Sequence, residues 1–304
     1  MAELREMINN VEIVGTIKNI NLRTGVSSAG KDYIGGKVDV EVREKDKINV
    51  ITVRVFSLKL KRDGNENGLY KGYKTVMDEY REGDKVRVTG SLRLEEYYTQ
   101  QGSLTSYNSV SALFFNRIDE GQDFKPKALA TIEMVVEGFE QELDKEQLPS
   151  GRLEVEGFTV GYNGTIIPLR NMVISEQLGE TFKSMYYPGT TGKITLKINN
   201  YAEVEEDEQQ DETPTGFGST ERVESNVVVN YVNNLEIIGG DLPYNDGVRE
   251  YTPEMIEQAK KNRALAVQEL QQQNMAASTP TGFGSSTPVT NKPVTITEDD
   301  LPDF

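Results

Sequence analysis

The chain lacks three residue types on which many active sites depend. It contains no cysteine, no histidine and no tryptophan among 304 residues. Without thiolate or imidazole groups it can form no disulfide, no zinc site with those ligands and no Ser-His-Asp triad. No run approaches the roughly 18 apolar residues of a membrane span. These absences predict a soluble, cytoplasmic protein with no membrane segment and no cofactor.

Positive charge is scarce overall but unevenly distributed. The net charge is -16, and the isoelectric point is about 4.7. Taken alone, these values argue against a nucleic-acid partner, because backbone phosphates favour basic surfaces. However, residues 1–127 carry a net charge of +2, residues 128–240 one of -13 and residues 241–304 one of -5. A phosphate-binding surface is therefore expected in the first part of the chain.

Short segments with alternating apolar residues predict five strands in a first domain, residues 1–124. These segments lie at residues 11–17, 36–42, 48–58, 85–94 and 109–115, separated by turns that contain Gly, Asn and Ser. Residues 70–80, between the third and fourth segments, favour a helix. Five strands interrupted in this way are typical of an OB-fold, a partly open barrel that binds oligonucleotides on one face.

The same order recurs after Lys125-Pro126-Lys127, a predicted linker. The candidate strands lie at residues 131–136, 152–160, 165–174, 193–198 and 226–238, with a helix at 176–186. They predict a second, diverged OB-like domain over residues 128–240. Residues 203–225 are acidic and polar, which predicts a disordered loop. The expected fold is mainly β, with two OB-fold-like five-stranded barrels in tandem.

A linker and a helix are predicted for residues 241–275, and a disordered tail for residues 276–304. Thr252-Pro253-Glu254 places threonine at a helix cap and proline at the first helical position. Two interpretations of this helix stay open. It is either a partner-recognition helix or an amphipathic strut whose apolar residues rest on a barrel. Those residues are Met255, Ile256, Ala259, Ala266 and Leu270.

The tail ends in acids, a proline and a terminal aromatic residue. Phe304 can fill an apolar pocket while neighbouring carboxylates meet Lys or Arg on its rim. The alternative is that the acids only keep the tail soluble. The partner-binding candidates are Asp299, Asp300, Leu301, Pro302, Asp303 and Phe304.

Four motifs occur in order along the chain. Residues 7–15 open with Met-Ile-Asn and end with Val-Gly, residues 51–56 end in Phe56, and residues 83–92 and 299–304 follow. Together they resemble motifs of the bacterial and phage single-stranded DNA-binding protein family, over about residues 7–118 and 298–304. The resemblance implies non-enzymatic, largely sequence-independent binding of single-stranded DNA in replication, recombination or repair. It also implies that the tip recruits a helicase, primase, polymerase or recombinase.

The chain departs from this family's pattern in three ways. Asp303 separates Pro302 from Phe304, where the family has proline and phenylalanine adjacent. The family's usual tryptophans are missing. A second, acidic barrel is also unlike the usual one-barrel subunit, which leaves self-association as a homo-oligomer open. Such variation is typical of phage-encoded members, so we expect a phage-encoded protein that acts in the host cytoplasm.

The alternation of the third strand predicts a DNA-binding face. Val53 and Val55 should point inward, which places Arg54 and Phe56 together on the outside. An aromatic beside a cation suits single strands, since stacking contributes roughly 1 to 3 kcal/mol per base. For each tyrosine named next, packing at the barrel edge is the alternative. The remaining DNA-binding candidates are Lys59, Lys61, Arg62, Lys85, Arg87, Arg93, Tyr97, Tyr98, Tyr33 and Tyr107.

Aromatic residues of the second barrel, such as Phe158 and Tyr187, have few cations near them in sequence. A role in self-association or partner contact is therefore favoured there over DNA binding. The heptapeptide Thr-Pro-Thr-Gly-Phe-Gly-Ser also occurs twice, at residues 213–219 and 279–285. Its phenylalanine is either a second docking anchor or a weak contact with the DNA groove or another chain, and the alternative is a duplicated linker.

Two other classes of function compete with DNA binding. A metal-dependent nuclease needs only carboxylates, yet no paired-carboxylate motif lies on an identifiable scaffold. The other alternative is an interaction adaptor whose two barrels both bind proteins.

Overall fold

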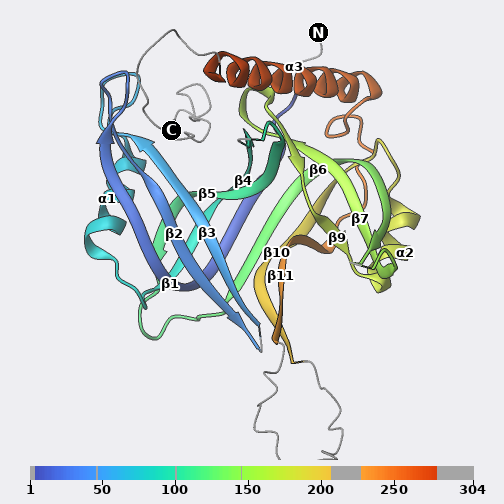
Figure 1. Cartoon of the computed structure of the whole chain (residues 1–304), viewed down its shortest axis with the longest axis horizontal. Coiled ribbons are helices and arrows are strands. Elements are labelled where there is room, and N and C mark those ends of the chain that lie inside the picture. Colours follow the sequence, from blue (N-terminus) through green and yellow to red (C-terminus); the bar gives the residue numbers. More distant parts are fainter. Residues whose placement is uncertain (1–3, 46, 100, 145, 207–226, 279–304) are drawn as a thin grey trace, which may run out of the picture.

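Eleven strands, in the part of the chain that the structure describes, form one sheet that closes on itself twice. This computed structural model describes residues 4–278 apart from residues 46, 100, 145 and 207–226 (Figure 1). We call the two closed units barrel 1 and barrel 2.

Barrel 1 has the strand order of an OB-fold. Its ring runs β1-β2-β3-β5-β4 and back to β1, with β3 and β5 parallel. The strands are β1 (Asn9–Val26), β2 (Asp32–Glu44), β3 (Lys47–Leu58), β4 (Lys85–Tyr98) and β5 (Leu104–Arg117). Between β3 and β4 lies α1 (Gly68–Glu79), which begins where the Asn67 side chain accepts a hydrogen bond from the Leu69 amide. The predicted first barrel and its helix are confirmed.

Barrel 2 repeats this order with a divided third strand. Its ring runs β6-β7-β9-β11-β10 and back to β6, and β9 and β11 are parallel. Its strands are β6 (Lys127–Leu143), β7 (Pro149–Val160), β8 (Ile166–Leu169), β9 (Met172–Ile174), β10 (Thr191–Glu206) and β11 (Val227–Gly240). A short helix η1 (Tyr162–Gly164) follows β7, and α2 (Glu176–Met185) follows β9. The prediction of two tandem OB-like barrels is confirmed.

Three predicted boundaries are wrong. The strand expected at 165–174 is broken by a turn in which Asn171 has a φ of 52°, a conformation that asparagine tolerates better than most residues. The loop expected from residue 203 begins later, because residues 203–206 continue β10 and pair with residues 227–230. Backbone pairing does not require apolar side chains. Lys127 begins β6 rather than ending a linker.

The two barrels are joined through their first strands. β1 pairs antiparallel with β6, from Asn9 opposite Ile132 to Val14 opposite Lys127. Lys127 also donates a 2.6 Å hydrogen bond to the Glu12 carboxylate. Buried residues of both barrels belong to one hydrophobic cluster. The barrels therefore share a core as well as a sheet, and their relative placement is fixed by the backbone.

The helix α3 (Pro253–Ser278) lies across one end of both barrels (Figure 1). The Thr252 hydroxyl caps its first turn by accepting a hydrogen bond from the Met255 amide. Ala259 is buried, and Met255 and Ile256 pack beside it on the outer face of barrel 2. These contacts agree with the strut interpretation for Met255, Ile256 and Ala259, whereas Ala266 is exposed. The helix also continues past residue 276, where the tail was expected to start. Among the described residues no helix is long and apolar enough to cross a membrane.

The N-terminal segment covers the same outer face of barrel 2 through a buried carboxylate. Glu133 of β6 accepts hydrogen bonds from Arg5 at 2.7 Å, from the Ile8 amide at 3.0 Å and from the Tyr244 hydroxyl at 2.7 Å. Burial alone would raise the pKa of Glu133, but these hydrogen bonds outweigh it and lower that pKa. Glu133 therefore ties the N-terminus and the segment before α3 to barrel 2.

Candidate nucleic-acid interface

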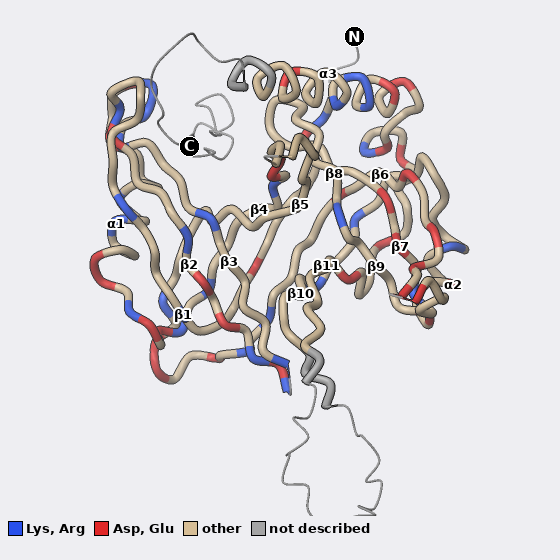
Figure 2. The backbone as a smooth tube through the Cα atoms, viewed as in Figure 1, with Lys and Arg blue, Asp and Glu red and all other residues tan. Residues whose placement is uncertain are grey.

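The candidate interface is the outer surface of barrel 1 over strands β2, β3, β5 and β4. Val38, Val53 and Val110 point into the core and are buried, so their neighbours in each strand face outward. In the resulting row, Lys37 lies opposite Arg54, and Arg54 lies opposite Ser111. Figure 2 shows Lys and Arg on β2 and β3 in this region. Period-two alternation thus brings cations from two strands together.

An aromatic pair forms one end of this surface. Tyr33 of β2 and Phe56 of β3 are stacked, with ring centroids 5.7 Å apart and an interplanar angle of 28°. Gly25 makes the position of the Tyr33 ring possible, because a Cβ there would lie only 2.8 Å from that ring. The Phe56 ring lies over Gly35, at van der Waals distance from where a Cβ would be. The two stacked rings form one aromatic platform on the sheet.

Arg54 lies at the centre of the surface and is held by two partners. Its Nη2 donates a 2.8 Å hydrogen bond to the Tyr107 hydroxyl, and its Nε lies 3.3 Å from Oε1 of Glu95. Glu95 also accepts a hydrogen bond from the Ser109 hydroxyl at 3.0 Å. The guanidinium is thus oriented in advance, but Glu95 partly neutralises it. A phosphate that binds here must compete with this carboxylate.

A second aromatic pair follows Arg54 on the β4–β5 hairpin. The rings of Tyr97 and Tyr107 meet edge to face, with centroids 6.5 Å apart and an interplanar angle of 83°. Tyr97 is 41% exposed. Across the surface, the stacked pair of Tyr33 and Phe56 is thus followed by Arg54 and then by the pair of Tyr97 and Tyr107. This arrangement can stack bases and bind the phosphates between them.

Further predicted cations extend the surface beyond Phe56. Lys59 forms a 3.1 Å ion pair with Asp32, and the hydrogen bond to this carboxylate raises the pKa of Lys59 above its usual value. Lys61 and Arg62 lie in the turn that follows, where Leu60 bridges to Glu66. Lys59 thus lies near Tyr33, the residue after Asp32, and Lys61 and Arg62 follow Lys59 along the chain.

Four other predicted residues lie apart from this centre. The ammonium of Lys85 lies 4.9 Å from the Phe124 ring centroid, and Arg87 pairs with Glu12 at 3.2 Å. Along β4, Lys85 lies about 26 Å and Arg87 about 20 Å from Arg93. Arg93 itself shares the outward face with Tyr97 and lines a pocket next to α3. Tyr98 lies on the opposite face of the strand from Tyr97. The structure thus does not bring Lys85, Arg87 and Tyr98 to the surface around Arg54.

Two residues of this surface are missing from the sequence-based candidates. Lys37 is exposed on β2 opposite Arg54. The buried alternation of Val38, Val40 and Val42 carried the signal, since it places Lys37 outward. Glu95 gave no such signal, because its pairing with Arg54 joins strands that are distant in sequence.

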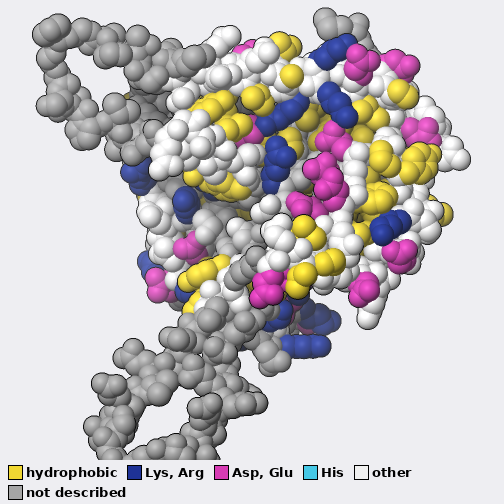
Figure 3. All heavy atoms as spheres, turned by 45° about the vertical axis from the view of Figure 1, so that its right-hand side comes forward, with side chains coloured by type: hydrophobic (Ala, Val, Ile, Leu, Met, Phe, Trp, Pro, Cys, Tyr) yellow, Lys and Arg dark blue, Asp and Glu magenta, His cyan; other side chains and the backbone are white. Residues whose placement is uncertain are grey.

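Barrel 2 has different chemistry at the equivalent position. Glu154 of β7 lies opposite Val173 of β9, and Val173 lies opposite Glu236 of β11. This row of barrel 2 corresponds to the row Lys37, Arg54 and Ser111 of barrel 1. In each barrel the row lies next to the buried residues of that barrel's own parallel strand pair. Figure 3 shows acidic side chains gathered on the side of the molecule that carries barrel 2. Val173 is itself buried, and the two glutamates beside it would repel phosphates at this position.

Within the described ranges, no group of three or more His, Cys, Asp or Glu residues is arranged to hold a metal ion. The predicted docking tip, Asp299 to Phe304, lies outside the described residues. Both copies of the repeated heptapeptide, at 213–219 and 279–285, also lie outside them.

Solved structures similar to this chain are single-stranded DNA-binding proteins, the group that the sequence motifs resemble. A deletion variant of the protein from Thermus aquaticus is 12% identical, with 82% of this chain and 98% of that chain covered and a TM-score of 0.48. The mitochondrial protein from S. cerevisiae is 18% identical, covering 38% and 98%, with a TM-score of 0.27. The Plasmodium falciparum protein, in complex with single-stranded DNA, is 13% identical, covering 39% and 100%, with a TM-score of 0.28.

These likenesses have TM-scores below 0.5, so the fold assignment rests on the strand order of the chain itself. A comparison with curated proteins found no match. The model of one protein family, described as YorF, matches residues 7–273. This match runs from the segment before β1 through both barrels and into α3, and the chain therefore belongs to the YorF family.

Proposed function

We propose that barrel 1 binds single-stranded DNA with little sequence preference. The observation that supports this proposal is the row of Tyr33, Phe56, Arg54, Tyr107 and Tyr97 on one outer face. Aromatic rings stack on any base, and cations bind any phosphate, so this combination favours single strands without selecting a sequence. The acidic average charge of the chain does not oppose it, because the acidity lies outside residues 1–127.

In the proposed complex, one or two bases stack on the platform of Tyr33 and Phe56. Arg54 turns from Glu95 to a phosphate, and Lys37 meets the same strand from β2. Lys59, Lys61 and Arg62 continue the phosphate contacts beyond the platform. Each phosphate that is neutralised releases counterions, so the affinity should fall steeply with salt. A strand held in this way is protected and cannot form hairpins.

The test is a titration of the full-length chain with polythymidylate at several salt concentrations. Tyrosine fluorescence is the signal that reports binding. Arg54→Ala should weaken binding about 10-fold and reduce the salt slope by about one. Arg152→Ala is the matched control. It removes an arginine that also pairs with a glutamate, Glu142 at 2.6 Å, but on β7 of barrel 2. A wild-type chain that does not bind at low salt would contradict the proposal.

The broader role that we propose is non-enzymatic protection of single strands during replication, recombination or repair. The order of the sequence motifs favours a phage-encoded protein that acts in the host cytoplasm. The acidic tip, Asp299 to Phe304, would recruit a helicase, primase, polymerase or recombinase. Deleting residues 296–304 should abolish capture of such proteins from a host lysate while DNA binding is retained. Unchanged capture would assign recruitment to another segment.

A contact role for barrel 2 is supported by its exposed apolar side chains. Tyr187 and Leu242 are 67% and 71% exposed, and Leu178 is 40% exposed. Leu242 directly follows the last strand of barrel 2, and we propose that these side chains contact a protein partner or a second copy of the chain. Analytical ultracentrifugation of the full chain would distinguish these outcomes. The nuclease alternative gains no support from the described residues, which show no carboxylate cluster of the required kind.

A further inference from the structure

The outer half of the β4–β5 hairpin, residues 94–108, has two faces with different partners. One face carries Glu95, Tyr97 and Tyr107, which belong to the proposed DNA-binding surface. Alternation places Glu96 and Asn108 on the opposite face. These two residues contact α3 and barrel 2. The hairpin thus separates the proposed DNA-binding surface from α3 and barrel 2.

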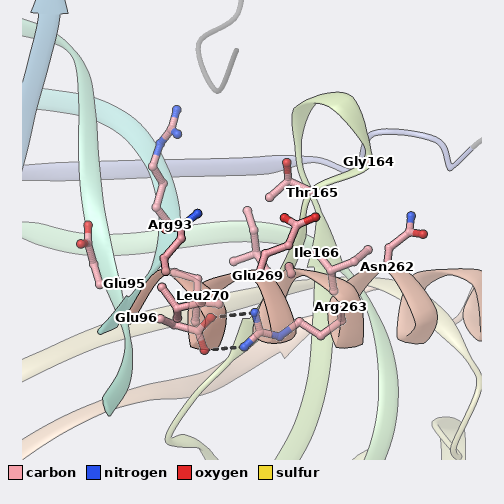
Figure 4. Close-up of a pocket in the computed structure, with 14 residues that line it drawn as sticks. Arg93, Glu95, Glu96, Gly164, Thr165, Ile166, Asn262, Arg263, Glu269 and Leu270 are labelled. Atoms are coloured by element: carbon pink, nitrogen blue, oxygen red, sulfur yellow. Dashed lines mark hydrogen bonds and ion pairs between the residues drawn. The ribbon is translucent and has the colours of Figure 1, made fainter. Parts of the chain in front are cut away.

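On the back of the hairpin, Arg263 of α3 forms a two-pronged ion pair with Glu96. Its Nη1 lies 2.7 Å from Oε2 of Glu96, and its Nη2 binds Oε1. The side chains are only 18% and 10% exposed. Figure 4 shows Glu96 and Arg263 pointing toward one another, whereas Arg93 extends away from the helix. A paired-fork contact fixes direction as well as distance.

A second set of contacts joins the hairpin to the turn between β8 and β9. The Asn108 side-chain amide donates a 2.9 Å hydrogen bond to the Pro168 carbonyl. Its Oδ1 accepts one of 2.6 Å from the Arg170 amide, and the Arg170 side chain lies 3.4 Å from the Ser106 hydroxyl. Asn108 thus satisfies one carbonyl and one N–H of barrel 2 with a single side chain.

These polar contacts matter because packing between the same elements is incomplete. A pocket of about 480 Å³ lies between the hairpin, β8 and α3. Leu94, Ile166 and Leu270 line it (Figure 4). A two-stranded ribbon by itself is only marginally stable in water. The position of the hairpin beyond barrel 1 therefore depends on the contacts at Glu96 and Asn108.

We infer that barrel 2 and α3 act as a brace that holds the hairpin in its DNA-binding position. Glu96, Asn108, Arg170 and Arg263 are its positioning residues. This inference rests on the proposed binding of DNA by barrel 1. A hairpin that samples other positions spends less time in the competent one, and the apparent affinity falls by that fraction. The acidic barrel would thus contribute to DNA binding without touching DNA.

A charge exchange tests the brace. Arg263→Glu and Glu96→Arg should each weaken polythymidylate binding roughly fivefold, and the double variant should recover to within about twofold. Glu96→Arg adds positive charge, so a purely long-range electrostatic effect would strengthen binding instead. The salt slope should stay at the wild-type value, because no phosphate contact is removed. Hydrogen exchange of amides 94–107 should rise in each single variant and return in the double variant.

Lys261→Glu is the matched control. Lys261 lies on the exposed side of α3, where it pairs with Glu257 at 2.7 Å. The change in charge equals that of Arg263→Glu, and wild-type affinity is expected. Asn108→Ala provides a second variant if the arginine variant fails to fold, with the same weakening and the same local rise in exchange.

Wild-type affinity in Arg263→Glu and Asn108→Ala would overturn the brace and leave the proposed function intact. Failure of the wild-type chain to bind polythymidylate would instead refute the proposed function itself.

Discussion

The two barrels share one strand order but differ in the row of outward positions beside the parallel strand pair. In barrel 1 this row is Lys37, Arg54 and Ser111, and in barrel 2 it is Glu154, Val173 and Glu236. The inward neighbours are apolar and buried in both. The shared fold is therefore specified by inward residues, whereas the outward residues decide what each barrel can bind.

The barrels also differ in what covers their outer faces. On barrel 2, Phe158, Val160 and Ile166 point outward but are buried beneath Met7, Tyr251 and the first turns of α3. The corresponding chain segments do not cover Tyr97 of barrel 1, which stays 41% exposed. The outer face of barrel 2 is thus covered by other segments of the chain, whereas barrel 1 keeps Tyr97 exposed to solvent.

Removal of the aromatic platform should produce the largest difference between the barrels. The double variant Tyr33→Ala, Phe56→Ala should lose about 100-fold in affinity for polythymidylate, since each stacked base contributes roughly 1 to 3 kcal/mol. Tyr187→Ala removes a 67% exposed tyrosine from barrel 2 and should leave the affinity unchanged. A comparable loss in both variants would mean that barrel 2 shares the binding. Equilibrium titration of both chains measures this.

The covered face of barrel 2 should show itself in acid stability. The hydrogen bonds that lower the pKa of Glu133 stabilise the fold above the unfolded carboxyl pKa, about 4.3. That stabilisation is lost as the pH falls through the lowered folded-state pKa. Glu133→Gln should therefore cost about 1 to 3 kcal/mol of unfolding free energy at pH 7. The difference from wild type should shrink below about pH 4.

Glu41→Gln is the control for this measurement on barrel 1. Glu41 pairs with Arg43 at 2.9 Å on the surface, where the arginine side chain is 64% exposed. Exposed pairs contribute about 0 to 1 kcal/mol. Urea unfolding across pH 3 to 8 compares the two variants, and equal losses would refute the assigned role of Glu133.

Charge changes in the outward row should alter DNA affinity strongly in barrel 1 and only weakly in barrel 2. Lys37→Glu gives barrel 1 the charge of barrel 2 and should weaken DNA binding about 10-fold. The reverse change, Glu154→Lys, should improve affinity less than about twofold, because the aromatic pairs described in barrel 2, Phe139 with Phe182 and Phe182 with Tyr186, pack in its core. A large gain from Glu154→Lys would show that charge alone separates the barrels. Both affinities come from titrations at one fixed salt concentration.

Residues with a local signal were predictable from the sequence. Alternation within β3 identifies Arg54 and Phe56 as outward neighbours, and Thr252-Pro253 marks the start of α3. The same alternation separates Tyr97 from Tyr98, although the sequence-based candidates included both. Arg87 shares the outward face of β4, but its distance along the strand removes it from the surface around Arg54.

Contacts between distant strands had no signal in a single sequence. The pairing of β1 with β6 joins two barrels that each look complete on their own. The contacts of Glu95 with Arg54, and of Glu96 with Arg263, depend on how the hairpin folds across the molecule. Two adjacent glutamates in a strand are usually interpreted as solvent-exposed. Here Glu95 contacts Arg54 on one face of the hairpin, and Glu96 contacts Arg263 on the other.

Glu95 gives the smallest predicted effect and the most direct view of how barrel 1 is tuned. Glutamine at this position keeps hydrogen-bonding atoms for Arg54 and Ser109 but removes the charge that competes with phosphate. Glu95→Gln should therefore bind polythymidylate about threefold more tightly, because it removes the charge of an ion pair whose side chains are 25% and 14% exposed. Asp78→Asn makes the same change in charge on α1, beside Lys74, and should leave affinity near wild type. Equal gains in both variants would reduce the effect to net charge. A gain in Glu95→Gln alone would show that the Glu95 carboxylate competes with DNA phosphates for Arg54. The outward row of barrel 2, Glu154, Val173 and Glu236, has no cation for which such competition could arise.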